Sequence, residues 1–169
     1  MRKLLFQGLT HAPLTEPPPE VDEEVGRLAR ELDVAARRRL GRSLAIRQVD
    51  AGSCNGCELE IHALNNAYYD VERYGVHFVA SPRHADLLLV TGPVSRHMQA
   101  ALLRAYEVMP EPKLVLAVGD CGADGGEFGV SYASCGAVSN VVPVDGVIRG
   151  CPPTPQTLLR GILQVIDKL

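Results

Sequence analysis

The sequence has few aromatic residues, no long apolar run and no excess of basic charge. Tryptophan is absent and only 5% of the 169 residues are aromatic, so aliphatic side chains must fill the core. No apolar stretch reaches the roughly 18 residues that mark a membrane-spanning helix. The net charge of −3 lacks the basic footprint of a nucleic-acid-binding protein. The sequence therefore argues against an integral membrane protein and against a nucleic-acid-binding protein.

The amino-terminal stretch also lacks the pattern of a secretory signal. Residues 1–14 carry charge and then apolar residues, but the apolar part is too short and too interrupted for a signal peptide. We therefore expect the chain in the cytosol. In that reducing compartment, five cysteines indicate metal ligands or free thiols before they indicate disulfides.

The first 42 residues differ in composition from the rest of the chain. Three consecutive prolines indicate an extended arm over residues 1–20. Residues 20–42 predict a helix, with acidic residues at its start and arginines at its end, as the helix dipole favours. Its apolar side chains recur at helical spacing: Val21, Val25, Leu28 and Leu32. Such a helix covers its own core, lies on a partner, or lies on a membrane surface by its basic end. We expect residues 1–42 to form an arm and an amphipathic docking helix, followed by an α/β domain over residues 43–169.

Strands and helices alternate from residue 43 onward. Apolar runs predict strands at 44–49, 76–80, 86–91, 113–118 and 141–144. Helical patterns follow at 58–72, after Ser95, and after Thr154, where Ser95 and Thr154 are suited to be N-caps. This alternation predicts an α/β fold, with an open parallel sheet and helices on both faces.

Four cysteines follow the predicted strands. Cys54 and Cys57 come after the first strand, Cys121 comes after the strand at 113–118, and Cys151 comes after the last strand region. Ligands bind at the carboxyl ends of the strands in such sheets. We therefore expect three separate loops to bring four thiols to one edge.

Three kinds of site can use these thiols. Four thiolates complete the ligand set of a 4Fe-4S cluster, and glycines beside the cysteines allow close backbone approach. Structural zinc also takes four cysteines, usually as two close pairs. A single C-x-x-C pair is also found in redox-active thiols. Spacing alone leaves all three open. The fifth cysteine, Cys135, lies away from any predicted strand end, and we expect it to be a buried apolar residue.

Several stretches resemble the small subunit of membrane-bound NiFe hydrogenases of the formate hydrogenlyase type, which is related to the terminal-cluster subunit of respiratory complex I. The matching stretches are GSCNGCELEI at 52–61, residues 70–98, GDCGADGGEFGVSY at 119–132, and residues 141–162. The resemblance implies a flavodoxin-like fold and one 4Fe-4S cluster on Cys54, Cys57, Cys121 and Cys151. Complex I subunits have two adjacent cysteines at the first ligand site, whereas this chain has a C-x-x-C pair, as the hydrogenases do.

The resemblance also implies a role and partners. The chain would be a non-catalytic electron-transfer subunit of an oxidoreductase, with no small-molecule substrate of its own. It would relay electrons between a NiFe large subunit and a ferredoxin-like two-cluster subunit. Integral membrane subunits would hold the complex on the cytoplasmic face of the cell membrane. Two alternatives are a nickel-free, complex I-like quinone or ferredoxin oxidoreductase subunit and a structural zinc scaffold.

Two pairs of charged residues each have two interpretations. Glu58 and Glu60 directly follow the C-x-x-C pair and are expected either to relay protons or contact a partner, or to be first-turn carboxylates favoured by the helix dipole. Arg83 and His84 precede a buried strand and are expected either to face the large subunit or to lie in a solvated loop.

Overall fold

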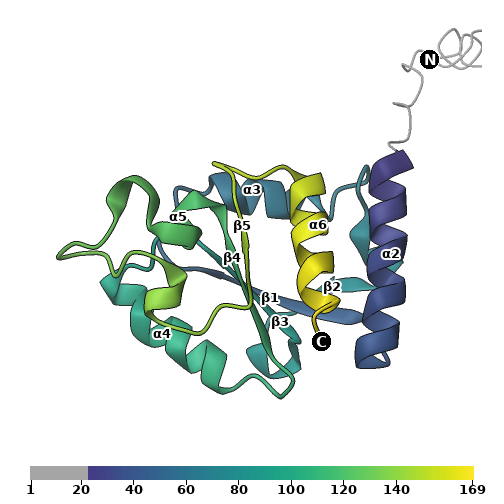
Figure 1. The fold of residues 1–169 in the computed structure, drawn as a ribbon, viewed down its shortest axis with the longest axis horizontal. Helices are drawn as coiled ribbons and strands as arrows, with labels where there is room; N and C mark the ends of the chain where they lie inside the picture. Colours follow the sequence, from purple (N-terminus) through teal and green to yellow (C-terminus); the bar gives the residue numbers. More distant parts are fainter. Residues whose placement is uncertain (1–22) are drawn as a thin grey trace, which may run out of the picture.

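Five parallel strands form the central sheet of the computed structural model, which describes residues 23–169 (Figure 1). The strands are β1 (Leu44–Asp50), β2 (Val76–Phe78), β3 (Leu87–Thr91), β4 (Leu114–Val118) and β5 (Gly146–Ile148). Their order in the sheet is β2-β1-β3-β4-β5, and every neighbouring pair is parallel. This is the strand order of flavodoxin-like sheets, so the predicted fold is confirmed.

Helices cover both faces of this sheet. They are α2 (Glu23–Leu40), α3 (Gly56–Ala63), α4 (Arg96–Glu107), α5 (Gly119–Asp124) and α6 (Pro155–Ile166). Side chains alternate between the two faces along each strand. Leu87 and Leu89 belong to the core shared with α2, α3 and α6, whereas Leu88 and Val90 belong to the core shared with α4 and the segment at 135–142. The central strands are therefore buried on both sides, which explains their unbroken apolar sequences.

Two predicted helix starts are confirmed. The Ser95 hydroxyl accepts a hydrogen bond from the Met98 N–H at the start of α4. The Thr154 hydroxyl does the same for the Thr157 N–H at the start of α6. Each hydroxyl satisfies a backbone donor that the first turn leaves free.

The helix predicted over 58–72 is shorter than expected. It spans Gly56–Ala63 as α3, and a separate 3-10 turn follows at Val71–Tyr74. The Asn66 side-chain oxygen accepts hydrogen bonds from the Tyr68 and Tyr69 N–H groups, at 2.9 and 3.0 Å. This local turn offers the backbone an alternative to the helical hydrogen bonds, so the helix ends before it.

The strand predicted over 141–144 is wrong. A 3-10 turn occupies Val138–Asn140, and the fifth strand begins only at Gly146. Pro143 lacks the N–H that a strand ladder needs, and Val142 instead packs into the core from a loop. The apolar pattern there indicated burial and not strand pairing.

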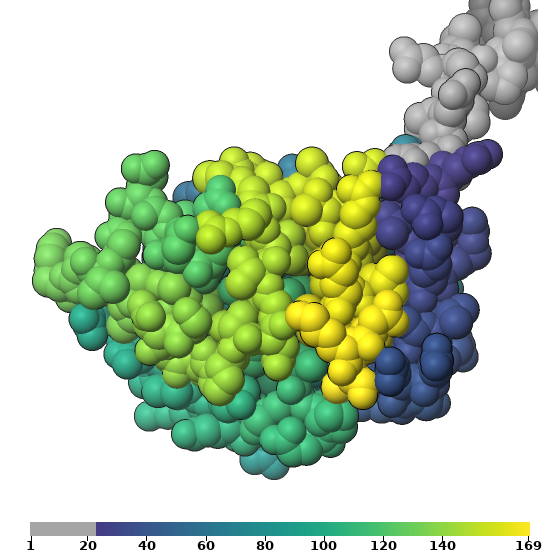
Figure 2. Space-filling model, in the orientation of Figure 1, coloured from purple at the N-terminus to yellow at the C-terminus, as the bar shows by residue number. Residues whose placement is uncertain are grey.

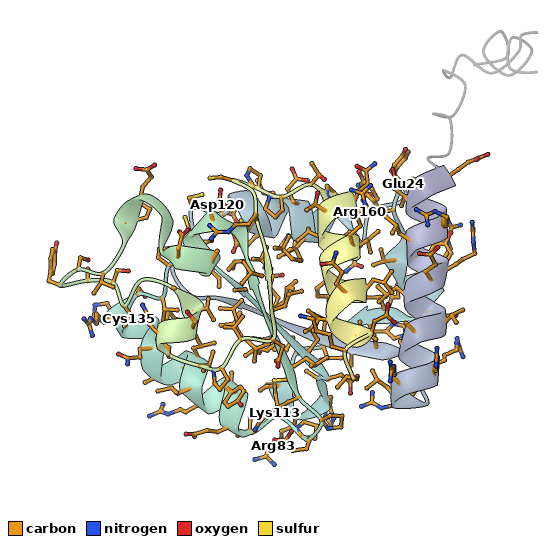
Figure 3. The ribbon with its side chains drawn as sticks, in the orientation of Figure 1. Glu24, Arg83, Lys113, Asp120, Cys135 and Arg160 are labelled. Carbon is orange, nitrogen blue, oxygen red and sulfur yellow. The ribbon has the colours of Figure 1, made fainter. Side chains whose placement is uncertain are left out.

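The amino-terminal helix α2 packs on its own chain. Val25, Leu28 and Leu32 are buried in the core shared with α6, and Leu32 is fully buried. Figure 2 shows α2 and α6 side by side, and Figure 3 shows Glu24 of α2 directed toward Arg160 of α6, with which it forms an ion pair. This placement corrects the expectation that these three side chains dock on a neighbouring subunit. Val21 and the predicted arm over residues 1–20 lie outside the described residues.

A buried carboxylate ties the loop before β1 to the start of β3. The Asp86 carboxylate accepts hydrogen bonds from the Ala45 N–H at 3.0 Å and from the Arg42 guanidinium at 2.6 Å. We expect Asp86→Ala to lower the free energy of unfolding by about 1–3 kcal/mol, because it leaves a buried N–H without a partner. Arg42→Ala should cost less than Asp86→Ala, because the Arg42 side chain is half-exposed and Asp86 keeps its hydrogen bond from the Ala45 N–H. Urea unfolding measures both, and equal losses would contradict this account.

Candidate functional site

Three loops at the carboxyl edge of the sheet carry four of the five cysteines. Cys54 follows β1 and Cys57 lies in the first turn of α3. Cys121 lies in α5, which begins directly after β4, and Cys151 lies between β5 and α6. Figure 1 shows α3, α5 and the connection from β5 to α6 along the same edge. The structure thus brings the three loops to one edge, as we expected from their positions after the strands.

Glycines at this edge show how closely the loops approach. A Cβ atom added at Gly119 would lie 2.7 Å from the Cys57 sulfur and 3.4 Å from the Gly150 carbonyl oxygen. A Cβ atom added at Gly56 would lie 3.5 Å from the Cys54 sulfur and 3.9 Å from Pro152. Gly119 also has a φ of 80°, a conformation that side chains other than glycine rarely adopt. The loops after β1, β4 and β5 therefore meet at the thiols.

Hydrogen bonds join the loop of Cys121 to the loop of Cys151. The Asp120 N–H donates to the Gly150 carbonyl at 3.0 Å, and the Asp120 carboxylate accepts from the Gly150 N–H at 3.1 Å. Arg149 adds an ion pair with Asp124 at 2.5 Å, and this hydrogen-bonded contact holds the pKa of Asp124 below its usual range. Figure 3 shows Asp120 at α5. The two loops are thus fixed relative to each other.

Asp50 shapes the loop that carries the first thiol. Its carboxylate accepts hydrogen bonds from the N–H groups of Gly52 and Ser53, both at 2.8 Å. The Ser53 hydroxyl then accepts from the Asn55 N–H at 3.1 Å, and Asn55 has a left-handed φ of 72°. Sequence reasoning missed Asp50 as a positioning residue. The signal was present, since an aspartate followed two residues later by glycine is typical of such a side-chain-to-backbone turn.

Burial and nearby negative charges raise the pKa of the two partly buried thiols, Cys57 and Cys121. Burial raises the pKa of Cys57 to about 12, and the charges of Glu58 and of the other three edge cysteines act in the same direction. Burial also raises the pKa of Cys121, with Cys151 and Cys54 adding to the effect. The four thiols therefore lie within electrostatic reach of one another. Bound metal cations would instead lower the pKa of these thiols, because a coordinated thiol is deprotonated.

The donor set at this edge fits an iron–sulfur cluster. A 4Fe-4S cluster takes four cysteine thiolates, whereas a structural zinc ion needs its four ligands around a single point. Within residues 23–169, no three side chains of His, Cys, Asp or Glu are grouped so that they could hold one metal ion.

Other residues singled out from the sequence lie elsewhere. Cys135 is buried in the core on the α4 side, where its thiol lies 3.5 Å from the Gln99 side-chain oxygen (Figure 3). This is the apolar environment expected for it. Arg83 and His84 precede β3 and so lie toward the amino ends of the strands, away from the cysteine edge (Figure 3). They therefore lie away from the thiols, and the expectation that they face the large subunit stays a prediction.

The fold is an α/β fold with a flavodoxin-like sheet, and four cysteines lie on loops at its carboxyl edge. The chain belongs to the family described as NADH ubiquinone oxidoreductase, 20 Kd subunit, whose model matches residues 54–165. Members of this family are subunits of oxidoreductase complexes, and iron–sulfur binding is typical of them. The matched span runs from the first edge cysteine into α6.

Relatives come from hydrogenase and complex I-type assemblies. The chain is 42% identical to formate hydrogenlyase subunit 7 of Escherichia coli, over 90% of this chain and 58% of the relative. It is 44% identical to the probable membrane-bound hydrogenase subunit mbhJ of Pyrococcus furiosus, over 77% of this chain and 78% of that protein. It is 46% identical to an NADH-quinone oxidoreductase subunit of Herpetosiphon aurantiacus, over 67% of this chain and 63% of that protein. The resemblance inferred from the sequence is confirmed.

A solved structure supports the same relationship. A chain of the membrane-bound sulfane sulfur reductase, an archaeal respiratory membrane complex, matches with a TM-score of 0.65 and 35% identity, over 82% of this chain and 76% of that chain. This chain spans only 58% of the length of the Escherichia coli relative. In the described part of the chain, no helix has both the length and the hydrophobicity needed to cross a membrane.

Proposed function

We propose that this chain is an electron-transfer subunit that holds a single 4Fe-4S cluster on Cys54, Cys57, Cys121 and Cys151. The observation that supports this most is the gathering of four thiols from three strand-end loops at one edge. A cluster bound there supplies one-electron redox chemistry. The chain's own residues provide the thiolates, and Gly119 leaves room for the innermost sulfur. Asp50 and Asp120 hold the loops in place.

The partners we propose are those of a membrane-bound hydrogenase. The chain would relay electrons between a NiFe-type large subunit and a ferredoxin-like two-cluster subunit, with integral membrane subunits holding the assembly on the cytoplasmic face. The names of the Escherichia coli and Pyrococcus relatives support this assignment. The C-x-x-C pair favours it over a nickel-free complex I-like subunit, the alternative that the Herpetosiphon relative represents.

The surface beside the thiols fits a partner. Cys54 and Cys151 are exposed in the single chain. The segment after α5 projects from the body, as the green loop in Figures 1 and 2 shows, and its large apolar side chains are open to solvent: Phe128, Val130 and Tyr132. Exposed apolar side chains next to a redox site are typical of an interaction surface, and their coverage by a partner would keep water from the cluster.

Single Cys→Ser substitutions test the ligand assignment. We expect each of Cys54, Cys57, Cys121 and Cys151 to be required for a full iron content in the assembled complex, because each would supply one thiolate. Cys135→Ser is the matched control and should keep its iron, since Cys135 is packed in the core. Iron and zinc analysis with visible absorption measures the outcome.

Two results would contradict the assignment. A colourless complex with stoichiometric zinc would replace the cluster with a structural metal. Loss of iron in Cys135→Ser together with retention in Cys121→Ser would show that the ligand set is wrong.

A further inference from the structure

The outer edge of β1 is open over the second half of the strand. β2 pairs only with the first three residues of β1 and ends at Phe78, whereas β3 pairs with β1 on its other side as far as Asp50. The last hydrogen bond on the β2 side runs from the Val79 N–H to the Ile46 carbonyl, at 2.8 Å. Backbone groups point alternately to the two sides of a strand. Gln48, two residues after Ile46, therefore directs its N–H and C=O toward a side where the described chain provides no further strand.

A groove of about 450 Å³ lies along this open edge, between β1, α3 and the segment that leaves β2. On the α3 side its lining includes the apolar side chains of Ile61 and Phe78, which contact the core shared with α2, α3 and α6. On the other face of β1 the lining includes Arg47 and Val79, and Val79 packs against the core of the α4 side. An extended chain in the groove would thus present its side chains alternately to an apolar surface and to a guanidinium.

Arg47 gives the groove a positive charge that has no partner in the described part of the chain. No ion pair or hydrogen bond within residues 23–169 involves its guanidinium, and the residue is half-buried. The acidic residue of the lining, Asp50, belongs to the opposite face of β1, and its carboxylate accepts hydrogen bonds from the Gly52 and Ser53 N–H groups at 2.8 Å. A carboxylate brought by an occupant would form a charge-assisted hydrogen bond with Arg47. The charge of the groove therefore favours an acidic occupant.

We propose that this open edge of β1 receives an extended segment of a neighbouring subunit, which continues the strand ladder beyond β2 and places an acidic side chain against Arg47. Strand addition of this kind obtains affinity from backbone hydrogen bonds and specificity from alternate side chains. The open stretch, residues 47–50, spans about 13 Å at the usual rise of a strand and accommodates three or four residues. The inference goes beyond the proposed function. It requires an assembled neighbour but does not depend on a cluster.

Photo-crosslinking in the purified complex tests which chain occupies the groove. The photoreactive residue p-benzoylphenylalanine replaces Asn65, an exposed residue of the groove lining. We expect it to link to one segment of a neighbouring subunit, and peptide mapping by mass spectrometry should show apolar and acidic residues alternating in that segment. The same probe at Val34, on the exposed face of α2, is the control and should not link to that segment.

Charge variants test the contact with Arg47. Arg47→Glu should weaken the affinity of the chain for the linked subunit at least about tenfold, because it places like charges together. It should also speed hydrogen exchange of the Gln48 amide in the complex, since the added strand would be lost. Arg47→Lys keeps the charge and should stay closer to the wild type. Arg104→Glu makes the same change of charge at an exposed position on α4 and should leave the affinity nearly unchanged.

Several results would overturn the proposal. They are links from position 65 to residues 1–22 of the same chain, the absence of any protein link, and an equal loss of affinity in Arg104→Glu. If Arg47→Glu does not fold, Arg47→Gln removes the charge without reversing it, and an unchanged affinity in that variant would also overturn the proposal. Iron analysis of the same samples separates the two hypotheses. A complex with full iron and no link refutes the groove contact alone, whereas a linked complex without iron refutes the cluster alone.

Discussion

Replacement of Gly119 by alanine is expected to remove most of the iron from this subunit. The added Cβ atom would lie 2.7 Å from the Cys57 sulfur, closer than such atoms approach in folded proteins. The backbone there has a φ of 80°, so the new side chain would also strain the turn after β4. To accommodate the methyl group, the loop after β4 would have to displace the Cys57 thiol.

Gly122→Ala in the same helix is the matched control. Gly122 does not have a left-handed φ, and the nearest atom to its added Cβ would be the Val90 carbonyl oxygen at 3.4 Å. We expect this variant to keep at least most of its iron. Iron per chain, measured on both purified complexes, decides the outcome. Equal iron in Gly119→Ala and the wild type would show that the loop after β4 does not set the position of Cys57.

Leu32→Ala is expected to lower the free energy of unfolding by about 2–5 kcal/mol. Leu32 lies at the centre of α2 and is fully buried in the core shared with α6, so truncation leaves a cavity that its neighbours cannot fill. Val34→Ala on the exposed face of the same helix should cost less than about 1 kcal/mol. For the same reason, deletion of residues 1–42 should abolish folding rather than merely weaken attachment to partners. Thermal unfolding measures each variant.

A folded, iron-containing chain that lacks residues 1–42 would contradict this account of α2. It would show that α6 and the sheet retain a stable core without the helix. In that case the apolar face of α2 would again be available to a neighbouring subunit, as its sequence pattern allows.

The buried strands were predictable because both of their faces lie in a core. The apolar runs at 86–91 and 113–118 correspond to β3 and β4 within one residue, and the order of the elements indicated a parallel sheet. The helix caps at Ser95 and Thr154 were predictable from local chemistry alone. The gathering of the thiols followed from topology, since the carboxyl ends of parallel strands meet at one edge.

Other features depended on contacts that a single sequence does not reveal. An amphipathic helix has the same pattern whether it covers its own sheet or a partner, so the spacing of its apolar residues could not predict that α2 packs on α6. The apolar residues at 141–144 pack from a loop because Pro143 interrupts strand pairing. The burial of Glu58 arises from how α3 lies on the sheet, and composition gives no sign of it.

The four thiols differ in their exposure to solvent, so the site has an open side and a covered side. Cys57 and Cys121 are partly covered by the chain, whereas Cys54 and Cys151 face outward. If these four residues hold the proposed cluster, Cys57 and Cys121 would bind it on the side of the chain and Cys54 and Cys151 on the side of the solvent. Under the proposed function, electrons would enter and leave on that open side, and the proposed partners would have to cover it for fast transfer.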